Sequence, residues 1–215
     1  MHPAPLPFCG APGNSGGDPM TISEAKQAQR AQGKAARRAL SPARRAEASA
    51  RICAQLAALR SFRAAQRILL YAAFGAEVDL AALAEEAARQ GKQIAYPVCG
   101  EDFRLTAAVP APADGWEVGA YGIRTPILAR AEICPPDALD LILVPCTAFD
   151  AACRRVGMGK GYYDRYLPGC TRAVKIGAAF EAQRVPRAAV GPCDQRLDAF
   201  VTEKGIYRGT DETEL

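Results

Sequence analysis

Histidine and long apolar runs are scarce in this chain of 215 residues, and their scarcity narrows its possible functions. The only histidine is His2, and the eight cysteines form no C-x-x-C pair, which argues against a Cys/His zinc site. No apolar run approaches the ~18 residues that cross a membrane, and the N-terminus lacks the pattern of a signal peptide. We therefore expect a cytoplasmic protein with reduced, mostly buried thiols and no membrane partner.

Acidic residues are scarce at the N-terminal end. The net charge is only +4, but residues 20–67 carry many arginines and lysines against two glutamates. Lys26, Arg30 and Lys34 are spaced by four, so they share one face of a helix, where like charges repel mildly. Such a face suits an anionic partner, either polyphosphate or nucleic acid, or it is a solvated basic surface.

Composition divides the chain into three parts. Residues 1–20 are rich in proline and glycine, and we expect them to form a disordered extension. Residues 21–208 have the composition of a single globular domain, which we expect to be an α/β catalytic domain. Residues 209–215 form a polar tail.

Two helices are predicted at the start of the domain. Residues 21–39 are rich in alanine, glutamine and arginine and predict a helix despite Gly33. Ser41 and Pro42 then have the order of an N-cap and a first helical residue. We expect this second helix to end near Leu59.

The following segments predict a βαβ unit. Residues 67–74 form an apolar strand, and residues 80–90 form a helix that Asp79 caps and Gly91 ends. Residues 93–98 form the next strand. A βαβ unit implies parallel strands joined by a right-handed crossover.

The second half of the chain continues the alternation of strands and helices. In chain order, the predicted elements are a strand at 103–109, a long surface loop at 110–126, a central parallel strand at 139–150, a helix at 162–167, and strands at 173–180 and 197–203. The predicted fold is therefore α/β, with an open, mostly parallel sheet flanked by helices and a basic N-terminal helical segment.

A glycine-rich stretch, RVGMGKGYYD, runs from Arg155 to Asp164. It follows the predicted central strand, at the carboxyl edge where open α/β sheets bind ligands. Its glycines let backbone N–H groups approach phosphate oxygens, and Lys160 supplies a positive charge. The spacing fits neither the P-loop nor the dinucleotide fingerprint, so the residues alone leave open a flexible turn with an incidental lysine.

Several side chains near these glycines have two interpretations. Tyr162 and Tyr163 can stack on a flat heterocycle or pack beneath the loop. Asp164 can stabilise the start of the next helix or hold Mg²⁺. The remaining candidates are Glu77, expected at the same edge of the sheet, and Asp194 and Asp198, each a metal ligand or a turn residue.

Taken together, the motifs resemble the 5-formyltetrahydrofolate cyclo-ligases, also called 5,10-methenyltetrahydrofolate synthetases. The stretch RVGMGKGYYDRYL resembles the signature of this family. The segments RRALSPARR, FGAEVDLAALAEEAARQGKQIAYPV, LDLILVPCTAFD, AAFEAQRVP and CDQRLDAFVTEKGIY agree with the family in order and spacing. The resemblance runs from about Lys26 to Tyr207.

The resemblance implies a reaction that depends on ATP and Mg²⁺. In it, 5-formyltetrahydrofolate is cyclised to 5,10-methenyltetrahydrofolate through a phosphorylated formyl group, an iminium phosphate, and ADP and phosphate are released. Such chemistry needs positioning and charge neutralisation rather than a protein nucleophile. We expect a monomer that binds a reduced folate and no nucleic acid.

The resemblance also implies roles for individual residues. Lys26 and Arg30 match the family's phosphate-binding pair, and Glu77 matches the acid that binds the pterin. Asp164 and Asp194 match two carboxylates associated with magnesium.

The glycine-rich stretch matches the family's nucleotide loop. Lys160, Arg155 and Tyr162 are its expected catalytic residues, with Lys160 stabilising charge on the transferred phosphoryl group. The expected ATP-binding residues of the loop are Arg155, Val156, Gly157, Met158, Gly159, Lys160, Gly161, Tyr162 and Tyr163, of which Met158 to Tyr162 also face the folate.

Two departures from the family pattern stand beside the resemblance. Thr125 occupies a position where members commonly have an acid or amide, and Cys193 stands where a histidine often precedes the aspartate. Two other functions stay open: a paralogue that uses the same ATP loop on another formylated or pterin-like compound, and a module that binds nucleic acid through its basic helices.

Overall fold

The computed structural model describes residues 20–119 and 122–209. Of the expected disordered extension it describes Met20 alone, and of the polar tail Gly209 alone. The rest of both segments lies outside the described residues.

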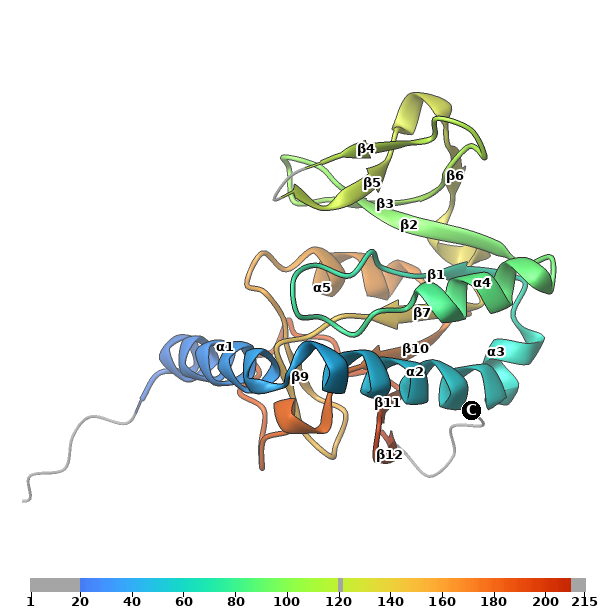
Figure 1. Ribbon diagram of the computed structural model, residues 1–215. Coiled ribbons are helices and arrows are strands. Elements are labelled where there is room, and N and C mark those ends of the chain that lie inside the picture. Colours follow the sequence, from blue (N-terminus) through green and yellow to red (C-terminus); the bar gives the residue numbers. More distant parts are fainter. Residues whose placement is uncertain (1–19, 120–121, 210–215) are drawn as a thin grey trace, which may run out of the picture.

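An eight-stranded sheet forms the centre of the molecule, with the strand order β12-β11-β10-β7-β1-β2-β3-β6 (Figure 1). Strands β11, β10, β7, β1 and β2 run parallel, whereas β12, β3 and β6 pair antiparallel at the two edges. The predicted open, mostly parallel sheet is confirmed. The strands are β1 (Arg67–Leu69), β2 (Gln93–Cys99), β3 (Leu105–Val109), β6 (Glu132–Cys134), β7 (Leu141–Val144), β10 (Val174–Ala178), β11 (Ala199–Thr202) and β12 (Gly205–Arg208).

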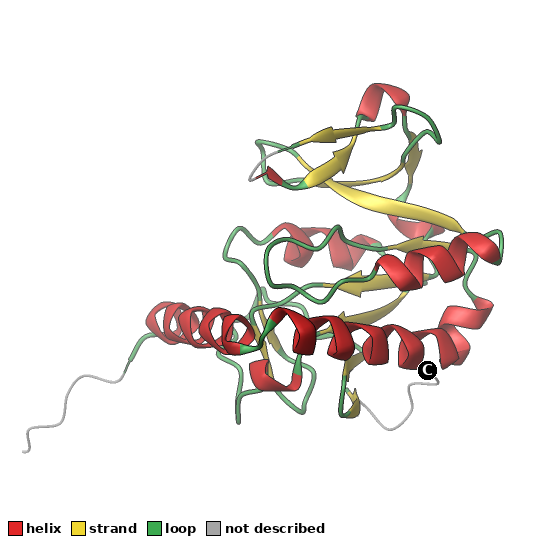
Figure 2. Ribbon diagram, in the orientation of Figure 1, coloured by secondary structure: helices red, strands yellow, loops and turns green. Residues whose placement is uncertain are grey.

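Helices cover both faces of this sheet (Figure 2). Successive residues of a strand point to opposite faces, so Leu141 and Leu143 pack with α2 and α4 while Ile142 and Val144 pack on the side of α5. The helices are α1 (Ile22–Ala39), α2 (Pro42–Ala58), α3 (Arg60–Ala64), α4 (Ala81–Arg89) and α5 (Tyr162–Tyr166). Short 3-10 turns are η2 (Leu128–Arg130), η3 (Pro136–Ala138), η4 (Leu167–Gly169) and η5 (Glu181–Gln183).

The starts of the first two helices agree with the prediction. Thr21 and Glu24 form a capping box at α1, in which the Thr21 N–H donates to a Glu24 carboxylate oxygen at 2.8 Å. The Ser41 hydroxyl accepts from the backbone N–H of Arg44 at 3.3 Å, and Pro42 is the first helical residue of α2. These caps satisfy N–H groups that have no partner within the helix.

Gly33 lies where α1 crosses the chain that follows β7. A Cβ atom at this position would lie 1.8 Å from the backbone oxygen of Thr147. Only glycine therefore allows α1 to approach this closely, which explains why a glycine interrupts an otherwise favourable helical sequence.

The first strand of the sheet is shorter than the apolar run that predicted it. The predicted strand at 67–74 ends at Leu69, although the Leu70 N–H still donates to the backbone oxygen of Ala95 in β2 at 3.0 Å. The Tyr71 hydroxyl then donates to the backbone oxygen of Val78. Asp79 accepts from the N–H of Ala81 at 2.9 Å but lies one residue before the N-cap of α4. Gly91 follows α4 at φ +70°, as predicted.

Three other predicted segments were wrong in part. The surface loop expected at 110–126 contains a two-stranded sheet of β4 (Trp116–Val118) and β5 (Arg124–Pro126). The central strand expected at 139–150 ends at Val144, and β8 (Ala148–Phe149) pairs separately with β9 (Arg155–Val156). The strand expected to be the last, β11, is followed by β12.

Two findings concern the expectations drawn from composition. The seven cysteines of the described ranges are free, and five of them are buried; Cys99 and Cys193 are exposed. Across the same ranges, the helices are too short or too polar to cross a membrane.

Candidate active site

A cavity of about 860 Å³ opens at the carboxyl edge of the parallel sheet. Its walls come from the chain after β1, the end of β2, the residue after β7 and the glycine-rich stretch. This lining contains every residue to which the family resemblance gave a role: Lys26, Arg30, Glu77, Arg155, Val156, Gly157, Met158, Gly159, Lys160, Gly161, Tyr162, Tyr163, Asp164 and Asp194. Lys34 and Asp198 are not in the lining, and Asp198 instead accepts from the backbone N–H of Lys175 at 2.7 Å.

The glycine-rich stretch owes its shape to two residues with positive φ. Gly159 has φ +107° and Gly161 has φ +69°, conformations that other residues rarely adopt. Gly161 is the N-cap of α5, so Asp164 does not cap this helix. The first two residues of the stretch form β9, so it begins in the β8–β9 hairpin rather than directly after the central strand β7.

Cations from α1 reach the same stretch. The Arg30 Nε donates to the backbone oxygen of Gly157 at 3.0 Å, and a Cβ at Gly159 would lie 3.4 Å from the Arg30 guanidinium carbon. Lys160 makes no ion pair among the residues that the structure describes, and its ammonium lies 5.7 Å from the centroid of the Phe103 ring. These positive groups face a cavity that can receive an anion.

Asp164 and Asp194 each hold a cation of the site. Asp194 Oδ2 pairs with the Lys26 ammonium at 2.5 Å. Asp164 Oδ1 pairs with the Arg155 guanidinium at 2.8 Å and also accepts from the Gln195 N–H at 3.0 Å. The other oxygen of each carboxylate accepts no hydrogen bond within the described part of the chain, so each is available to a ligand.

The two tyrosines of the stretch have different surroundings. The Tyr162 hydroxyl donates to the backbone oxygen of Gly100 at 3.0 Å and so joins α5 to the chain after β2. The Tyr163 hydroxyl is buried without a hydrogen-bond partner in the described ranges. Burial raises the pKa of Tyr163, so its hydroxyl is neutral.

Glu77 also lines the cavity, and it is paired with an arginine that the sequence had not marked as functional. The Arg37 Nη1 lies 3.4 Å from Glu77 Oε1, and the two side chains are 7% and 9% exposed. The backbone N–H of Phe74 donates to Glu77 Oε2 at 3.1 Å. Burial raises the pKa of Glu77, while the Phe74 hydrogen bond and the Arg37 charge act in the opposite direction.

Comparison with known proteins identifies the family of the chain. Residues 22–203 match the 5-formyltetrahydrofolate cyclo-ligase family. The chain belongs to this family. It is accordingly an enzyme, as the resemblance of its motifs predicted.

Relatives of the cyclo-ligase family cover most of the chain. The 5-formyltetrahydrofolate cyclo-ligase of Mus musculus is 28% identical over 198 residues, which are 86% of this chain and 96% of the mouse protein. The Escherichia coli 5-formyltetrahydrofolate cyclo-ligase is 27% identical over 175 residues, which are 80% and 96% of the two chains.

Two solved structures share the fold. The 5,10-methenyltetrahydrofolate synthetase of Aquifex aeolicus superposes with a TM-score of 0.75 at 32% identity and covers 91% of this chain and 96% of its own. The synthetase of Mycoplasma pneumoniae gives a TM-score of 0.68 at 27% identity, with 83% and 98% covered.

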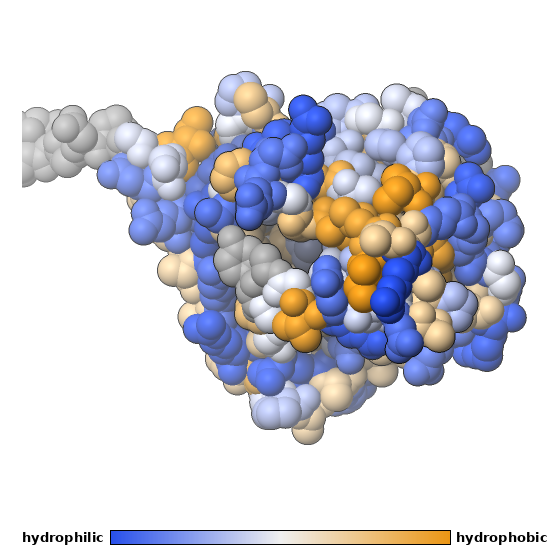
Figure 3. All heavy atoms as spheres, turned by 90° about the horizontal axis from the view of Figure 1, so that it is seen from above, coloured by the Kyte–Doolittle hydropathy of each residue, from blue (hydrophilic) through white to orange (hydrophobic). Residues whose placement is uncertain are grey.

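The β4–β5 hairpin, which the sequence predicted to be part of a loop, forms one wall of the cavity in this family member. Arg124 lines the cavity, and its guanidinium lies 4.5 Å from the centroid of the Trp116 ring. Thr125 and Cys193, the two departures from the family pattern, also line the cavity. Figure 3 shows the molecule from above, from the side on which the hairpin lies in Figure 1; this face is largely hydrophilic, with apolar residues gathered near its middle.

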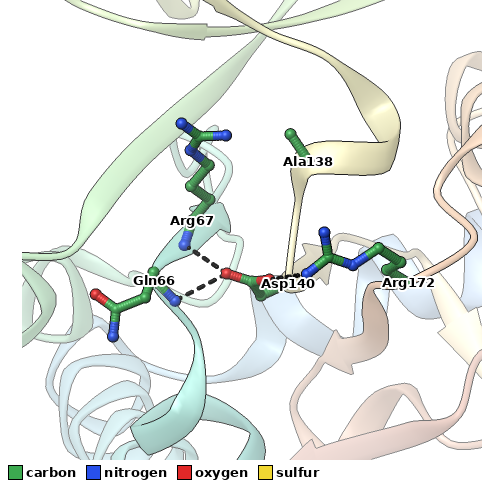
Figure 4. A pocket seen from close by; sticks show the side chains of 5 residues that line it. All are labelled: Gln66, Arg67, Ala138, Asp140 and Arg172. Carbon is green, nitrogen blue, oxygen red and sulfur yellow. Dashed lines mark hydrogen bonds and ion pairs between the residues drawn. The ribbon is translucent and has the colours of Figure 1, made fainter.

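A second, smaller pocket lies at the opposite edge of the sheet. Its volume is about 400 Å³, and it contains none of the residues that the cyclo-ligase motifs predicted. Asp140 accepts from the backbone N–H groups of Gln66 and Arg67, both at 2.9 Å, and pairs with Arg172 at 3.5 Å (Figure 4). Its carboxylate therefore joins the starts of β1 and β7, which is a structural role.

Proposed function

We propose that the large cavity catalyses the cyclisation of 5-formyltetrahydrofolate to 5,10-methenyltetrahydrofolate with consumption of ATP. The observation that carries the proposal is that a glycine-rich loop with cationic side chains and the buried carboxylate of Glu77 line one and the same cavity. The loop suits a polyphosphate, and the carboxylate suits the N–H donors of a pterin ring.

The chemistry of the reaction explains why the cavity needs both the phosphate-binding loop and the pterin-binding carboxylate. A formyl amide carbon is a weak electrophile because the nitrogen lone pair is delocalised into the carbonyl group. Transfer of the γ-phosphoryl group of ATP to the formyl oxygen releases ADP and gives an iminium phosphate. N10 of the folate then attacks this carbon, loses its proton, and the ring closes as phosphate departs. The protein has to align the two substrates and neutralise the phosphate charge.

The residues divide this work according to their positions. Lys26 and Arg30 reach the loop from α1 and bind phosphate oxygens. Lys160 stabilises charge on the transferred phosphoryl group, because its ammonium has no acidic partner in the described ranges. Arg155 and Tyr162 complete the catalytic set. Arg155 is held by its ion pair with Asp164, and Tyr162 by the hydrogen bond from its hydroxyl to the backbone oxygen of Gly100.

The carboxylates of the site also fit Mg²⁺. Mg²⁺ is commonly held by one or two carboxylates together with substrate phosphates and water rather than by a cage of protein ligands. In the described residues no group of three or more metal-binding side chains occurs, but Asp164 and Asp194 each present one unpaired oxygen to the cavity. When bound, Mg²⁺ would neutralise phosphate charge during transfer.

The test is a direct assay of the product. Purified protein is mixed with 5-formyltetrahydrofolate and Mg²⁺, and the near-ultraviolet absorbance of the methenyl product is followed with and without ATP. We expect a rise that depends on ATP. A folded protein that binds ATP but gives no rise would show that the loop serves a different acceptor, as in the paralogue hypothesis.

Metal binding is tested with a matched pair of variants. Asp194→Asn should raise the Mg²⁺ concentration needed for half-maximal rate, whereas Asp102→Asn should leave it unchanged because the Asp102 side chain is 59% exposed outside the cavity. Equal Mg²⁺ dependence in the two variants would remove Asp194 from the metal site.

A further inference from the structure

Arg37 is one of four charged side chains that are buried in the described part of the chain. The other three have evident roles. Lys92 donates to the backbone oxygens of Arg63 and Ala65, Asp150 pairs with Arg154, and Arg155 belongs to the glycine loop. Arg37 is directed at an acid of the cavity without lining the cavity itself.

The contacts of Arg37 and Phe74 hold both oxygens of the Glu77 carboxylate. Arg37 Nη1 lies 3.4 Å from Oε1 and also 3.4 Å from the backbone oxygen of Cys146, so the guanidinium is anchored to the end of β7. The Phe74 N–H holds Oε2 at 3.1 Å. The carboxylate is therefore held in one orientation, and Arg37, unlike Phe74, does not line the cavity.

The position of Arg37 follows from the packing of α1. Gly33 lies one turn earlier and brings the helix against the backbone of Thr147. Residues four apart lie on the same helical face, so Arg37 points at the neighbouring residue, Cys146. An exposed basic helix thus turns one of its arginines inward.

We propose that Arg37 is the positioning residue of Glu77, fixing the direction of its carboxylate so that it accepts hydrogen bonds from the N–H groups of a pterin ring. This role rests on the proposed function of the cavity. It makes α1 a contributor to folate recognition as well as to phosphate binding.

The electrostatic surroundings of Glu77 support this role. Burial raises its pKa, and in the described ranges Arg37 is the only charged side chain that lowers it. The pKa values of the titratable neighbours on the other elements are raised by burial, that of Cys146 to about 12, so these groups are neutral near pH 7: Tyr71, Cys146 and Tyr163.

Arg37→Met keeps much of the length of the side chain and removes its charge. Near neutral pH we expect the KM for 5-formyltetrahydrofolate to rise about tenfold or more, the typical effect of losing a hydrogen bond to a charged group. The KM for ATP and the kcat at saturating folate should stay close to the wild-type values. The folate KM should recover as pH rises, because Glu77 then ionises without Arg37.

Two further variants separate positioning from general damage. Arg37→Lys keeps the charge and should restore most of the folate affinity. Arg38→Met, at the neighbouring exposed position of the same helix, should change neither KM. If Arg37→Met fails to fold, Arg37→Met combined with Glu77→Gln removes both members of the buried pair, and folate binding is then measured by calorimetry without ATP. The double variant should bind folate as weakly as Glu77→Gln alone.

The possible results separate this proposal from the proposed function. The positioning role of Arg37 is overturned by any of three results. Arg37→Met leaves the folate KM unchanged, or it raises the KM values for folate and ATP equally at every pH. The third is a double variant that binds folate more weakly than Glu77→Gln. A wild-type protein that forms no methenyl product would overturn the proposed function together with this inference. A normal wild-type rate with any of the three results above would overturn the role of Arg37 alone.

Discussion

Replacing Gly33 with alanine is expected to force α1 away from the body of the enzyme. The new Cβ would lie 1.8 Å from the Thr147 oxygen, whereas Cβ atoms almost never come within 3.0 Å of such neighbours, so the two backbones must separate by about 1.2 Å. Alanine gains about 1 kcal/mol in helix propensity. Overpacking costs about 1–3 kcal/mol, and a contact with backbone falls at the upper end of this range. We expect a net loss of about 1–2 kcal/mol in the free energy of unfolding.

The same displacement should reduce activity, because Lys26, Arg30 and Arg37 all move with α1. A shift of about 1 Å in a positioned group can lower the rate about a hundredfold, so we expect a fall of that order in kcat/KM for both substrates. Urea denaturation and steady-state kinetics measure the two effects. Ala31→Gly, at an exposed position of the same helix, is the control and should lose about 1 kcal/mol through helix propensity with unchanged KM values. A Gly33→Ala protein as stable as the wild type, with normal kinetics, would refute this account of the glycine.

Three other outcomes are expected. Lys160→Ala should lower kcat by about 10²–10³-fold with an unchanged melting temperature, because this exposed side chain supports no core; a near-normal rate would remove Lys160 from catalysis. As pH falls through the raised pKa of Glu77, the carboxylate is protonated and the KM for folate should rise while that for ATP does not; parallel pH profiles for the two substrates would contradict this. Asp150→Ala should lower the free energy of unfolding by about 3–5 kcal/mol in urea denaturation. The reason is that the buried carboxylate accepts hydrogen bonds from three backbone N–H groups and pairs with Arg154. A loss below about 1 kcal/mol would show that water replaces these bonds.

Features that depend on a few neighbouring residues were predicted well from the sequence. Ser41 and Pro42 mark the start of α2, and Gly91 follows the end of α4, because caps and positive φ values are decided within one turn. The glycine stretch was recognised for the same reason, since its chemistry lies in consecutive residues.

Features that depend on distant parts of the chain were not predicted. The run at 67–74 stays apolar beyond its strand, so its pattern cannot show where the sheet ends. The β4–β5 hairpin lies in a segment rich in proline and glycine, which suggested a loop. Its strands are stabilised by pairing with each other and by contact with β2, and neither can be read from local sequence.

The site shows the same division. The sequence indicated Glu77 and Asp194 as site residues. It did not show that each forms an ion pair with a basic side chain of α1. Arg37 was counted with the basic residues of an exposed segment, although it is 5% exposed. The available signal was Gly33, because a glycine within a helix often marks a close approach to another part of the chain.

The docking of α1 has a consequence for the synthesis of the chain. Lys26 pairs with a residue 168 positions later, and α1 also packs against β8, β9 and η5. At about 5–20 residues per second, a ribosome needs roughly ten to thirty seconds to reach Asp194 after completing Lys26. In proteins, most of the stability of a helix comes from the packing of one face against the rest of the fold rather than from its own propensity. The first helix to be synthesised is therefore among the last elements to reach its native position, and Lys26 can meet Asp194 only after most strands of the sheet have been synthesised.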